Sequence, residues 1–387
     1  MEVYWIMFIY TVIVSYIIEY MNKQQGNVIS YQSQNMSIRT VGLFGAVTSF
    51  ALIIVFSGVR GYVADTTAYI YAFQEETRTL ADVPGFFADF ANVKGPLWIA
   101  LQIFVKNYIY DDVTVMLMIV AIFQGFAVAK TFSRYSDQFT FSTYLFVTGY
   151  TFYWMLNGTR QFMAVCILLL ASKYLFNKEF GKYLLWTLVA TCFHSTAIIC
   201  IVVYFVAQGE PFNKRVLWTI ALVLLCVLFL DSFTGILDSA LSETQYGVNE
   251  QESGGESGMN PLTTLMTLVP IILIWWRKKV FFATDRPRYI DVMINVACVN
   301  VGICLLANFT SGITFGRLPV YFTIYNYILI PVVIERAFWG IDKLIIKYSC
   351  IFLYMVYFLY QSYVAGMGRY STFYWKFFYE YFSIKLF

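Results

Sequence analysis

Three arginines, one aspartate and the only histidine of the chain are the side chains whose surroundings suggest chemistry. Arg60, Arg160 and Arg317 each lie at the edge of an apolar run, Asp65 follows Arg60, and His194 lies within an apolar run. An arginine at the centre of a membrane helix costs roughly 2.5–3.5 kcal/mol or more, so these guanidinium groups are expected at a membrane surface or in a watered cavity. Guanidinium groups bind phosphate, which is the anion we expect there.

The segment Asn157–Gln161 combines a cationic side chain with signals for the start of a helix. Asn157 and Thr159 are good N-cap residues, so a helix is predicted to begin here with its unpaired N–H groups beside Arg160. Because helix N-termini bind anions, this segment is a candidate phosphate site. The alternative is an interfacial arginine that extends to the lipid headgroups, and the same alternative applies to Arg317.

The stretch that follows Arg60 carries Asp65 and the aromatic residues Tyr62, Tyr69 and Tyr71. This combination suits a sugar phosphate. The arginine would bind the phosphate, the carboxylate would orient a hydroxyl or take its proton, and aromatic rings would cover the C–H face of a pyranose. The alternative is a surface ion pair between Arg60 and Asp65 within an interfacial belt of tyrosines.

His194 has a side chain that could exchange a proton or, when charged, hold a phosphate. The alternative is a hydrogen-bonded packing residue. A Ser-His-Asp hydrolase is disfavoured, because no Gly-x-Ser-x-Gly motif is present and Ser195 is adjacent to His194. Six acidic residues are interpreted as solvated loop charge: Glu75, Glu76, Asp82, Asp89, Asp111 and Asp112.

Cofactors and nucleic acids find no support in the sequence. No Gly-rich nucleotide loop or metal-ligand spacing occurs, and the seven cysteines lie within apolar runs, so no cofactor, metal or disulfide framework is expected. The net charge of +3 does not indicate a nucleic-acid partner.

The composition places these residues in a membrane protein. Of the 387 residues, 59% are hydrophobic and 13% are charged, whereas soluble domains carry about 25% charged residues. The apolar runs have the length of bilayer-crossing helices and lack the alternation of barrel strands. We therefore expect an all-α, polytopic helical bundle that forms a single integral membrane domain over residues 1–387.

Ten apolar runs are predicted to cross the bilayer: residues 3–18, 40–57, 113–130, 139–156, 159–176, 216–231, 261–276, 289–307, 318–334 and 342–360. Residues 97–110 are shorter and place Gln102 opposite an apolar stripe, so a helix on the membrane surface is predicted within an external loop, 58–112. A mobile, acidic external loop is expected at 232–260, and an external or interfacial tail at 361–387.

Residues 182–207 are long for one crossing and short for two. A single crossing would leave some of the basic loops outside, whereas cytoplasmic loops normally collect Lys and Arg. A re-entrant hairpin that turns near His194 places 17 of the 26 Lys and Arg residues inside. We therefore predict the hairpin, which puts Arg60, Arg160 and Arg317 together on the external face.

Four short motifs, in this order over about residues 40–335, resemble the signatures of the EpsG family of Wzy-like oligosaccharide polymerases. They are Phe56-Ser-Gly-Val-Arg60-Gly-Tyr with Asp65 and the aromatic row after it, Asn157-Gly-Thr-Arg160-Gln161-Phe-Met-Ala164, Phe193-His194-Ser-Thr-Ala197 and Gly316-Arg317-Leu-Pro-Val-Tyr321. Two positions depart from the family pattern. Ala64 precedes Asp65 where Gly-Thr-Asp is commoner, and Thr196 replaces the usual Ser.

The resemblance implies a bundle similar to GT-C-like membrane glycosyltransferases, in the bacterial cytoplasmic membrane with its active site outside. It implies polymerisation of oligosaccharide repeat units linked to undecaprenyl pyrophosphate, in capsular, exopolysaccharide or O-antigen synthesis. The growing glycan would pass to the terminal sugar of an incoming unit. A chain-length regulator and a flippase are implied as partners. The alternatives are a flippase or transporter of the same lipid-linked glycans, and a glycan ligase.

The resemblance and the chemistry together assign provisional roles to the candidate residues. Arg60, Arg160 and Arg317 would bind the pyrophosphate, with Arg160 also stabilising the leaving group, and these cations would replace a divalent metal. Asp65 or His194 would be the base, and Asp65 is preferred because a carboxylate can also orient a hydroxyl. The residues expected to contact the glycan are Tyr62, Tyr69, Tyr71, Asn157, Gln161 and Tyr321.

Overall fold

The structure, a computed structural model, is built almost entirely of helices. It describes residues 1–24, 29–30, 38–39, 41–89, 93, 95–229, 259–310, 315–372 and 374, with the backbone alone at 29–30 and 38–39. Within these residues the only strands are β1 (Ile29–Ser30) and β2 (Ile38–Arg39), which form one short antiparallel pair. Most of the predicted acidic loop, 232–260, and of the predicted tail, 361–387, lies outside the described residues.

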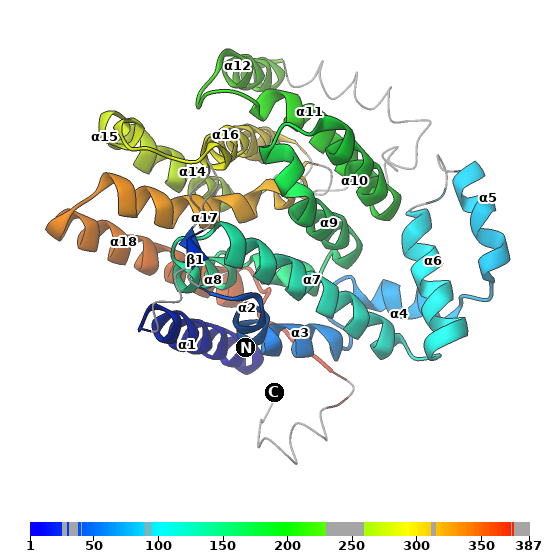
Figure 1. Cartoon of the computed structure of the whole chain (residues 1–387). Coiled ribbons are helices and arrows are strands. Elements are labelled where there is room, and N and C mark those ends of the chain that lie inside the picture. Colours follow the sequence, from blue (N-terminus) through cyan, green and yellow to red (C-terminus); the bar gives the residue numbers. More distant parts are fainter. Residues whose placement is uncertain are drawn as a thin grey trace.

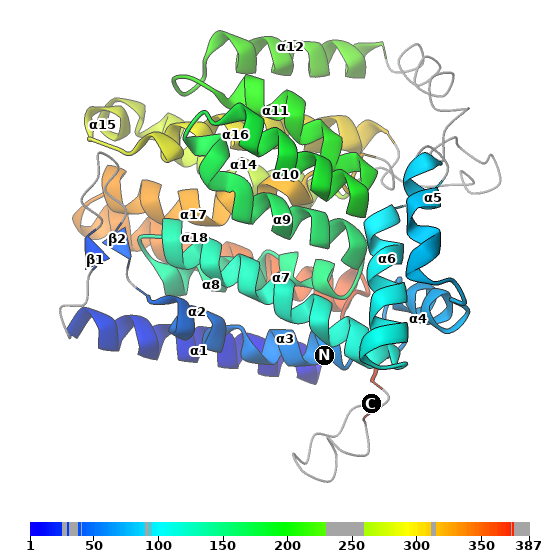
Figure 2. The same cartoon turned by 45° about the vertical axis from the view of Figure 1, so that its right-hand side comes forward.

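The helices lie in stacked layers, from α1 to α12 (Figure 2), and α5 and α6 stand across one end of the stack. The longer helices are α1 (Glu2–Gln24), α7 (Val113–Tyr135), α9 (Thr159–Phe176), α12 (Lys214–Leu228), α14 (Pro261–Trp276), α16 (Arg288–Phe309), α17 (Val320–Ala337) and α18 (Gly340–Leu359). The shorter ones are α2 (Leu43–Ser49), α3 (Ala51–Gly58), α4 (Thr66–Gln74), α5 (Val83–Ala88), α6 (Pro96–Phe104), α8 (Phe139–Thr148), α10 (Phe180–Phe193), α11 (Ile199–Ala207) and α15 (Lys278–Ala283). Brief 3₁₀ or π turns complete the fold: η1 (Leu80–Asp82), η2 (Val105–Ile109), η3 (Thr151–Met155), η4 (Ser195–Ile198) and η5 (Tyr360–Val364).

Side-chain caps fix where several helices begin. The Asp112 carboxylate accepts a hydrogen bond from the Thr114 backbone N–H at the start of α7, and Asn213 and Asn260 cap α12 and α14 in the same way. Such caps satisfy N–H groups that the helix leaves unpaired, and each contributes about 1 kcal/mol. The apolar runs between the caps therefore become helices with sharp beginnings.

Five of the described helices are long and apolar enough to cross a membrane, which indicates a multi-pass membrane protein. They are Glu2–Gln24, Val113–Tyr135, Thr159–Phe176, Arg288–Phe309 and Gly340–Val364. Residues 40–57 and 139–156, each predicted as one span, are instead divided, the first at Phe50 and the second where Tyr150 adopts a positive φ of 62°. The count of ten spans, like the likeness to GT-C-like enzymes, stays a prediction.

The core of the bundle lies around α9, α16 and α17. Side chains on these helices, such as Cys166, Ile294 and Ile328, are inaccessible to solvent. The outer helices α1 and α18 instead expose large apolar side chains, among them Ile13 and Phe352. This pattern is typical of helices that face lipid on one side and a packed core on the other.

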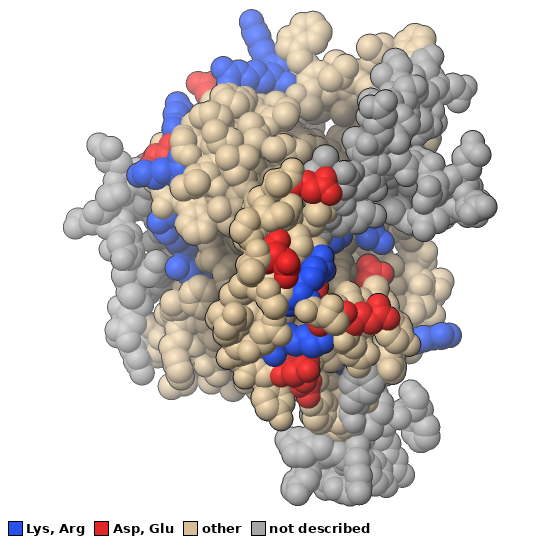
Figure 3. Space-filling view, turned by 90° about the vertical axis from the view of Figure 1, so that its right-hand side faces the viewer, with Lys and Arg blue, Asp and Glu red and all other residues tan. Residues whose placement is uncertain are grey.

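The charged side chains divide between the two ends of the bundle. The end opposite α6, which we name the basic end, is where α1, α7, α9 and α17 finish and where α10, α12, α16 and α18 begin (Figure 1). The helix ends and loops there carry Lys23, Lys130, Arg134, Lys173, Lys178, Lys182, Lys214, Arg215, Arg277, Lys278, Lys279, Arg286, Arg288, Arg336, Lys343 and Lys347. At the end that carries α4, α5 and α6, which we name the α6 end, acidic and basic side chains lie side by side (Figure 3).

Residues 182–207 form a helical hairpin. The chain runs along α10, turns at His194 and η4, and returns along α11, so that the ring of Phe180 lies 4.8 Å from that of Phe205. The Gln208 amide donates a hydrogen bond to the Leu175 carbonyl at 3.0 Å, which ties the end of α11 to the end of α9. The turn lies at the α6 end. That this hairpin is re-entrant stays a prediction.

The segment predicted to form a surface helix, 97–110, forms α6 and continues through the π turn η2. It stands across the end of the bundle rather than along it (Figure 2). The Lys106 ammonium donates hydrogen bonds to the carbonyls of Phe73 and Gln74, the last residues of α4, at 2.9 and 2.8 Å. A lysine at this position neutralises the negative end of α4 and fastens α6 to it.

Candidate functional site

A pocket of about 700 Å³ opens at the α6 end of the bundle, between α4, α6 and the beginning of α9. Asp65 at the start of α4, Arg160 at the start of α9, His194 at the hairpin turn and Arg317 before α17 all line it. The other lining residues are Ala68, Tyr69, Ala72, Glu75, Glu76, Thr77, Arg78, Trp98, Ile99, Gln102, Gly158 and Gln161. Residues separated by more than 250 positions in the sequence therefore converge on one cavity.

Arg160 is positioned by the first turn of α9. The N-cap of this helix is Gly158, with φ +66°, and an added Cβ there would lie 2.7 Å from the ring of Trp154. The expected capping by Asn157 does not occur, because its side chain makes no cap hydrogen bond, and its Oδ1 is buried with no hydrogen-bond partner among the described residues. Glycine therefore sets the direction of the chain as it enters α9.

A second glycine lets the chain pass close to Arg160. Gly95, with φ +73°, precedes α6, and an added Cβ would lie 2.5 Å from the Phe193 carbonyl oxygen and 3.2 Å from Cδ of Arg160. The backbone N–H of Arg160 also lies 3.5 Å from the Tyr69 hydroxyl of α4. Segments from α4, α6 and α9 thus meet at this arginine.

Arg317 and Asp65 face each other across the pocket. Their nearest charged atoms, Nη1 and Oδ2, are 3.8 Å apart, and the two side chains are 39% and 41% exposed. An ion pair this exposed contributes little stability, so breaking it to let either side chain bind a ligand costs little free energy. The Arg317 carbonyl accepts a hydrogen bond from the Gln161 amide at 3.0 Å, which ties the loop before α17 to α9.

His194 lies at the hairpin turn, outside the five candidate spans, and is held by a short chain of hydroxyl groups. Its Nδ1 lies 2.8 Å from the Thr196 hydroxyl, which lies 3.1 Å from the Tyr321 hydroxyl. Burial, followed by the charges of Arg160 and Arg317, lowers the pKa of His194 to about 3. The imidazole is therefore neutral at pH 7, and does not supply the positive charge that a phosphate-holding histidine would need.

Arg60 lies beneath the pocket rather than in it. Its side chain is 1% exposed, and its guanidinium donates hydrogen bonds to the Thr66 hydroxyl at 2.8 Å, the Thr159 hydroxyl at 2.7 Å and the Ser57 carbonyl. Burial lowers its pKa to about 10, so it stays charged at neutral pH. No described carboxylate lies within ion-pair distance of it. The donors expected to bind pyrophosphate are thus used within the protein.

The residues expected to contact a glycan divide into three groups. Tyr69 and Gln161 line the pocket. Tyr62 and Tyr71 are 57% and 54% exposed and do not line it. Tyr321 is buried behind His194, next to Thr196.

Trp98, Gln102, Glu76 and Arg78 line the pocket, although none was a candidate from the sequence. The amphipathic pattern of residues 97–110 placed Gln102 on the polar face of a surface helix, yet its side chain is only 3% exposed. The amphipathic pattern identifies the polar face of α6 correctly. That face lies against the pocket, however, and not in water. Glu76 was interpreted as solvated charge but is buried in an ion pair with Arg78, 2.6 Å apart.

The part of the chain that the structure describes contains no group of three or more His, Cys, Asp or Glu side chains suited to a metal ion. All seven cysteines are free, and each lies in or beside a packed helix.

Comparison with known proteins identifies one family. The EpsG family model matches residues 44–383, nearly the whole chain. The match includes every pocket residue and extends beyond the 40–335 region in which the four motifs lie. No curated protein and no solved structure matches this sequence. The motifs, the helical membrane architecture and the extent of the match lead to one conclusion: the chain belongs to the EpsG family.

Proposed function

We propose that this protein polymerises oligosaccharide repeat units linked to undecaprenyl pyrophosphate, in capsular, exopolysaccharide or O-antigen synthesis. Membership in the EpsG family suggests a Wzy-like polymerase of polysaccharide synthesis. The observation that carries the finer proposal is that Arg160 and Arg317 share one open pocket with Asp65. Two cations and a carboxylate in one cavity suit a ligand that has a diphosphate at one end and sugar hydroxyls at the other.

The proposed reaction transfers the growing glycan from its lipid carrier to an incoming unit. A hydroxyl of the terminal sugar of the acceptor attacks the anomeric carbon of the donor, and the bond from that carbon to the diphosphate oxygen breaks. Undecaprenyl pyrophosphate leaves with the bonding electrons, and the proton of the hydroxyl passes to the base. Negative charge grows on the leaving oxygen in the transition state, where Arg160 and Arg317 would stabilise it.

Asp65 is the better base of the two candidates. Its carboxylate lies at the pocket surface, 3.8 Å from Arg317, and is accessible to a substrate hydroxyl. The pKa of His194 is lowered to about 3, so this imidazole loses the advantage in basicity that a histidine ordinarily has over a carboxylate. We assign His194 the role of a neutral hydrogen-bonding group held by Thr196. The pocket arginines can supply the positive charge for which other glycosyltransferases use a divalent metal, so we propose a metal-independent reaction.

The charge distribution supports an external active site. Cytoplasmic loops of membrane proteins collect Lys and Arg, and the basic end of the bundle carries these residues, whereas the pocket opens at the other end. We propose that the basic end faces the cytoplasm and that the pocket opens outside the bacterial cytoplasmic membrane. A flippase that delivers repeat units to that face and a chain-length regulator are the partners this arrangement suits.

A flippase or transporter is the alternative from a different class. Moving a diphosphate across the bundle would require cationic groups along its length. Of the described residues, Glu19, Arg60 and Glu76 are the buried charged ones, and each lies near an end of the bundle. This distribution favours an enzyme. A glycan ligase would use the same donor chemistry with another acceptor, and the family membership favours the polymerase.

The test is incubation of the purified protein with lipid-linked repeat units, followed by gel analysis of chain length. The wild-type protein should produce a ladder, also in EDTA. Arg160→Ala and Arg317→Ala should each abolish it, and Arg160→Lys should be severely impaired, because an ammonium cannot make the bidentate phosphate contact of a guanidinium. Arg369→Ala is the matched control, since Arg369 is an exposed arginine at the same end that does not line the pocket. A ladder that persists in both pocket variants would contradict the proposal.

A further inference from the structure

The part of the pocket formed by α6 and the segment after α4 has a different character from its cationic part. It is lined by Trp98 and Gln102 of α6 and by Glu75 and Glu76, which follow α4. Arg78, which also lines this region, is paired with Glu76, and Glu75 adds a further negative charge, so a diphosphate is expected to lie at Arg160 and Arg317 and not here. Whatever occupies this region is then the uncharged part of the ligand.

Gln102 is the residue in this region that most clearly lacks a partner. Its side chain is 3% exposed, and its amide Nε2 has no hydrogen-bond partner among the described residues. A buried amide left unpaired costs about 1–3 kcal/mol, so proteins rarely retain one without a use. Because the amide can both donate and accept, a sugar hydroxyl in the pocket would satisfy it whichever way the group is turned.

Two aromatic rings lie beside Gln102. Trp98 is one turn earlier on α6, and its ring centroid lies 5.3 Å from that of Tyr69 on α4. Both residues line the pocket. Aromatic rings present apolar surface to the C–H face of a pyranose, while a neighbouring amide forms hydrogen bonds with its hydroxyl groups. Their combination in a single wall of the pocket points to a sugar.

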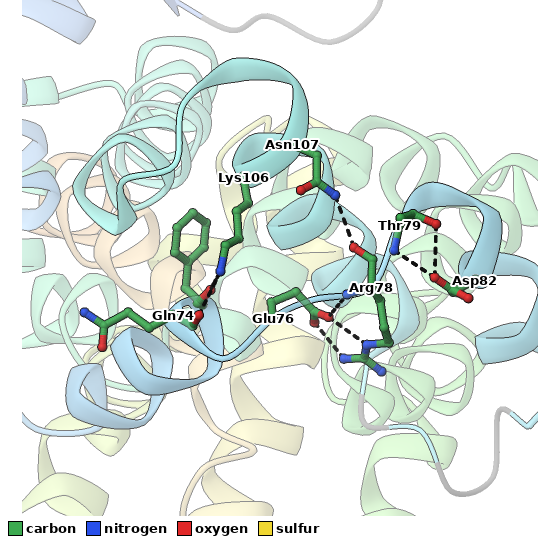
Figure 4. A network of polar contacts seen from close by, with 8 residues as sticks. Gln74, Glu76, Arg78, Thr79, Asp82, Lys106 and Asn107 are labelled. Carbon is green, nitrogen blue, oxygen red and sulfur yellow. Dashed lines mark hydrogen bonds and ion pairs between the residues drawn. The ribbon is translucent and has the colours of Figure 1, made fainter.

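This wall is held in place by a network of polar contacts, shown in Figure 4. Lys106 binds the carbonyls of Phe73 and Gln74, and the Asn107 amide donates to the Arg78 carbonyl at 3.1 Å. These contacts fasten η2, which continues α6, to the last residues of α4 and to the segment that follows them. A fixed wall loses little conformational freedom when a ligand binds.

The ion pair between Glu76 and Arg78 strengthens the same region. Arg78 donates to both carboxylate oxygens of Glu76, at 2.7 and 2.6 Å, and its guanidinium lies 4.8 Å from the centre of the Phe86 ring on α5. The carboxylate of Glu76 is thus neutralised by its own neighbour. Arg78 is correspondingly less available to a phosphate than Arg160 or Arg317.

We propose that Gln102, Trp98 and Tyr69 form a glycan subsite, which binds a neutral sugar ring of the lipid-linked oligosaccharide while Arg160 and Arg317 hold its diphosphate. The inference rests on the proposed function, since it names where the sugar part of that substrate lies. Gln102 donates or accepts a hydrogen bond with a sugar hydroxyl. The aromatic pair covers the apolar face of the ring.

The test compares binding of three probes to the full-length protein in lipid nanodiscs. They are lipid-linked oligosaccharide extracted from the source strain lacking this gene, the oligosaccharide released from that lipid, and farnesyl diphosphate, which has no sugar. Gln102→Met keeps the shape of the side chain and removes its hydrogen bonds. It should weaken both glycan probes about tenfold, the size of one lost hydrogen bond, and leave farnesyl diphosphate unchanged.

Protein stability separates a binding role from a structural one. Because Gln102→Met removes an unpaired buried amide, its thermal midpoint should equal or exceed that of the wild type. Gln102→Glu, which retains an acceptor, should recover part of the glycan affinity. Gln361→Met is the matched control: Gln361 is 5% exposed, is bonded to the Tyr357 hydroxyl and does not line the pocket. It should leave all three affinities unchanged.

Unchanged glycan affinity in Gln102→Met would overturn the inference while leaving the polymerase proposal standing, provided the wild type makes its ladder. Equal weakening of all three probes would also overturn it, because the effect would not be specific to sugar. If no ladder forms but glycan binding depends on Gln102, the polymerase proposal fails and the subsite stands. If the wild type binds no glycan probe, both fail.

Discussion

At the scale of single residues, the positive charge of the pocket comes from its arginines and not from its histidine. Arg160 and Arg317 line it as cations, whereas His194 is neutral because burial and these two arginines lower its pKa to about 3. A charged histidine beside two arginines would have suited phosphate even better electrostatically, but desolvation and repulsion oppose its protonation. The Thr196 hydroxyl at 2.8 Å from Nδ1 fixes the orientation of the neutral ring instead.

The lowered pKa of His194 predicts how stability depends on pH. The usual value is 6.5, so between pH 6.5 and about 3 the unfolded chain binds a proton that the folded protein does not. The contribution of neutral His194 to stability is therefore fully present above pH 6.5 and is lost as the pH falls toward 3. Lowering the pH from 7 to 5 should remove about 2 kcal/mol through this residue alone.

The measurement compares thermal unfolding of the wild type and His194→Gln at pH 7 and pH 5. Glutamine has no titrating group, so the variant should lose less stability on acidification than the wild type. An identical loss in the two proteins would show that folding does not shift the pKa of His194, contrary to the effect expected from its burial and from Arg160 and Arg317.

At the scale of elements, Arg60 joins the two helices that carry the site. Its guanidinium binds Thr66, the first residue of α4, and Thr159, the first residue of α9, so it fixes the distance between Asp65 and Arg160. Its hydrogen bonds to neutral oxygens compensate the burial of a charge that has no carboxylate partner among the described residues. We infer that Arg60 is a positioning residue.

This role predicts that replacing Arg60 lowers the stability of the protein more than it weakens ligand binding. Arg60→Ala leaves two buried hydroxyl groups and a carbonyl without their donor, and should lower the free energy of unfolding by about 3 kcal/mol or more. The fraction that stays folded should still bind farnesyl diphosphate, with an affinity that falls less than in Arg160→Ala, because the loss of Arg60 lets α4 and α9 shift but removes no group that contacts the ligand. A normal thermal midpoint combined with lost binding would instead place Arg60 in contact with the diphosphate.

At the scale of the whole molecule, the sequence predicts where long helices lie along the chain but not the contacts between them. The predicted span 159–176 coincides with α9, Thr159–Phe176, because a bilayer-length apolar run between cap-rich segments leaves few other conformations. The predicted span 139–156 ends early, since the close approach of Tyr327 to Gly149 and the positive φ of Tyr150 turn the chain. Local hydropathy does not report such tertiary contacts, so it could not predict this break.

The same limit applies to the candidate site: several of its residues could be predicted, but their arrangement could not. Arg160, Arg317, Asp65 and His194 could be found from the sequence, because charged or titratable residues are costly inside a bilayer and are therefore expected at its surface or in a watered cavity. Their convergence on one pocket required the fold. Gln102 could not be identified, since amphipathic periodicity reports which face of a helix is polar and not what lies opposite it.

The central claim is that Arg160 and Arg317 together bind a lipid-linked diphosphate at the α6 end, and equilibrium binding of farnesyl diphosphate to the protein in nanodiscs tests it most directly. Arg160→Ala and Arg317→Ala should each weaken binding at least about tenfold, as expected for a charged hydrogen bond, while Arg369→Ala binds as the wild type does. Wild-type affinity in both pocket variants would contradict the account.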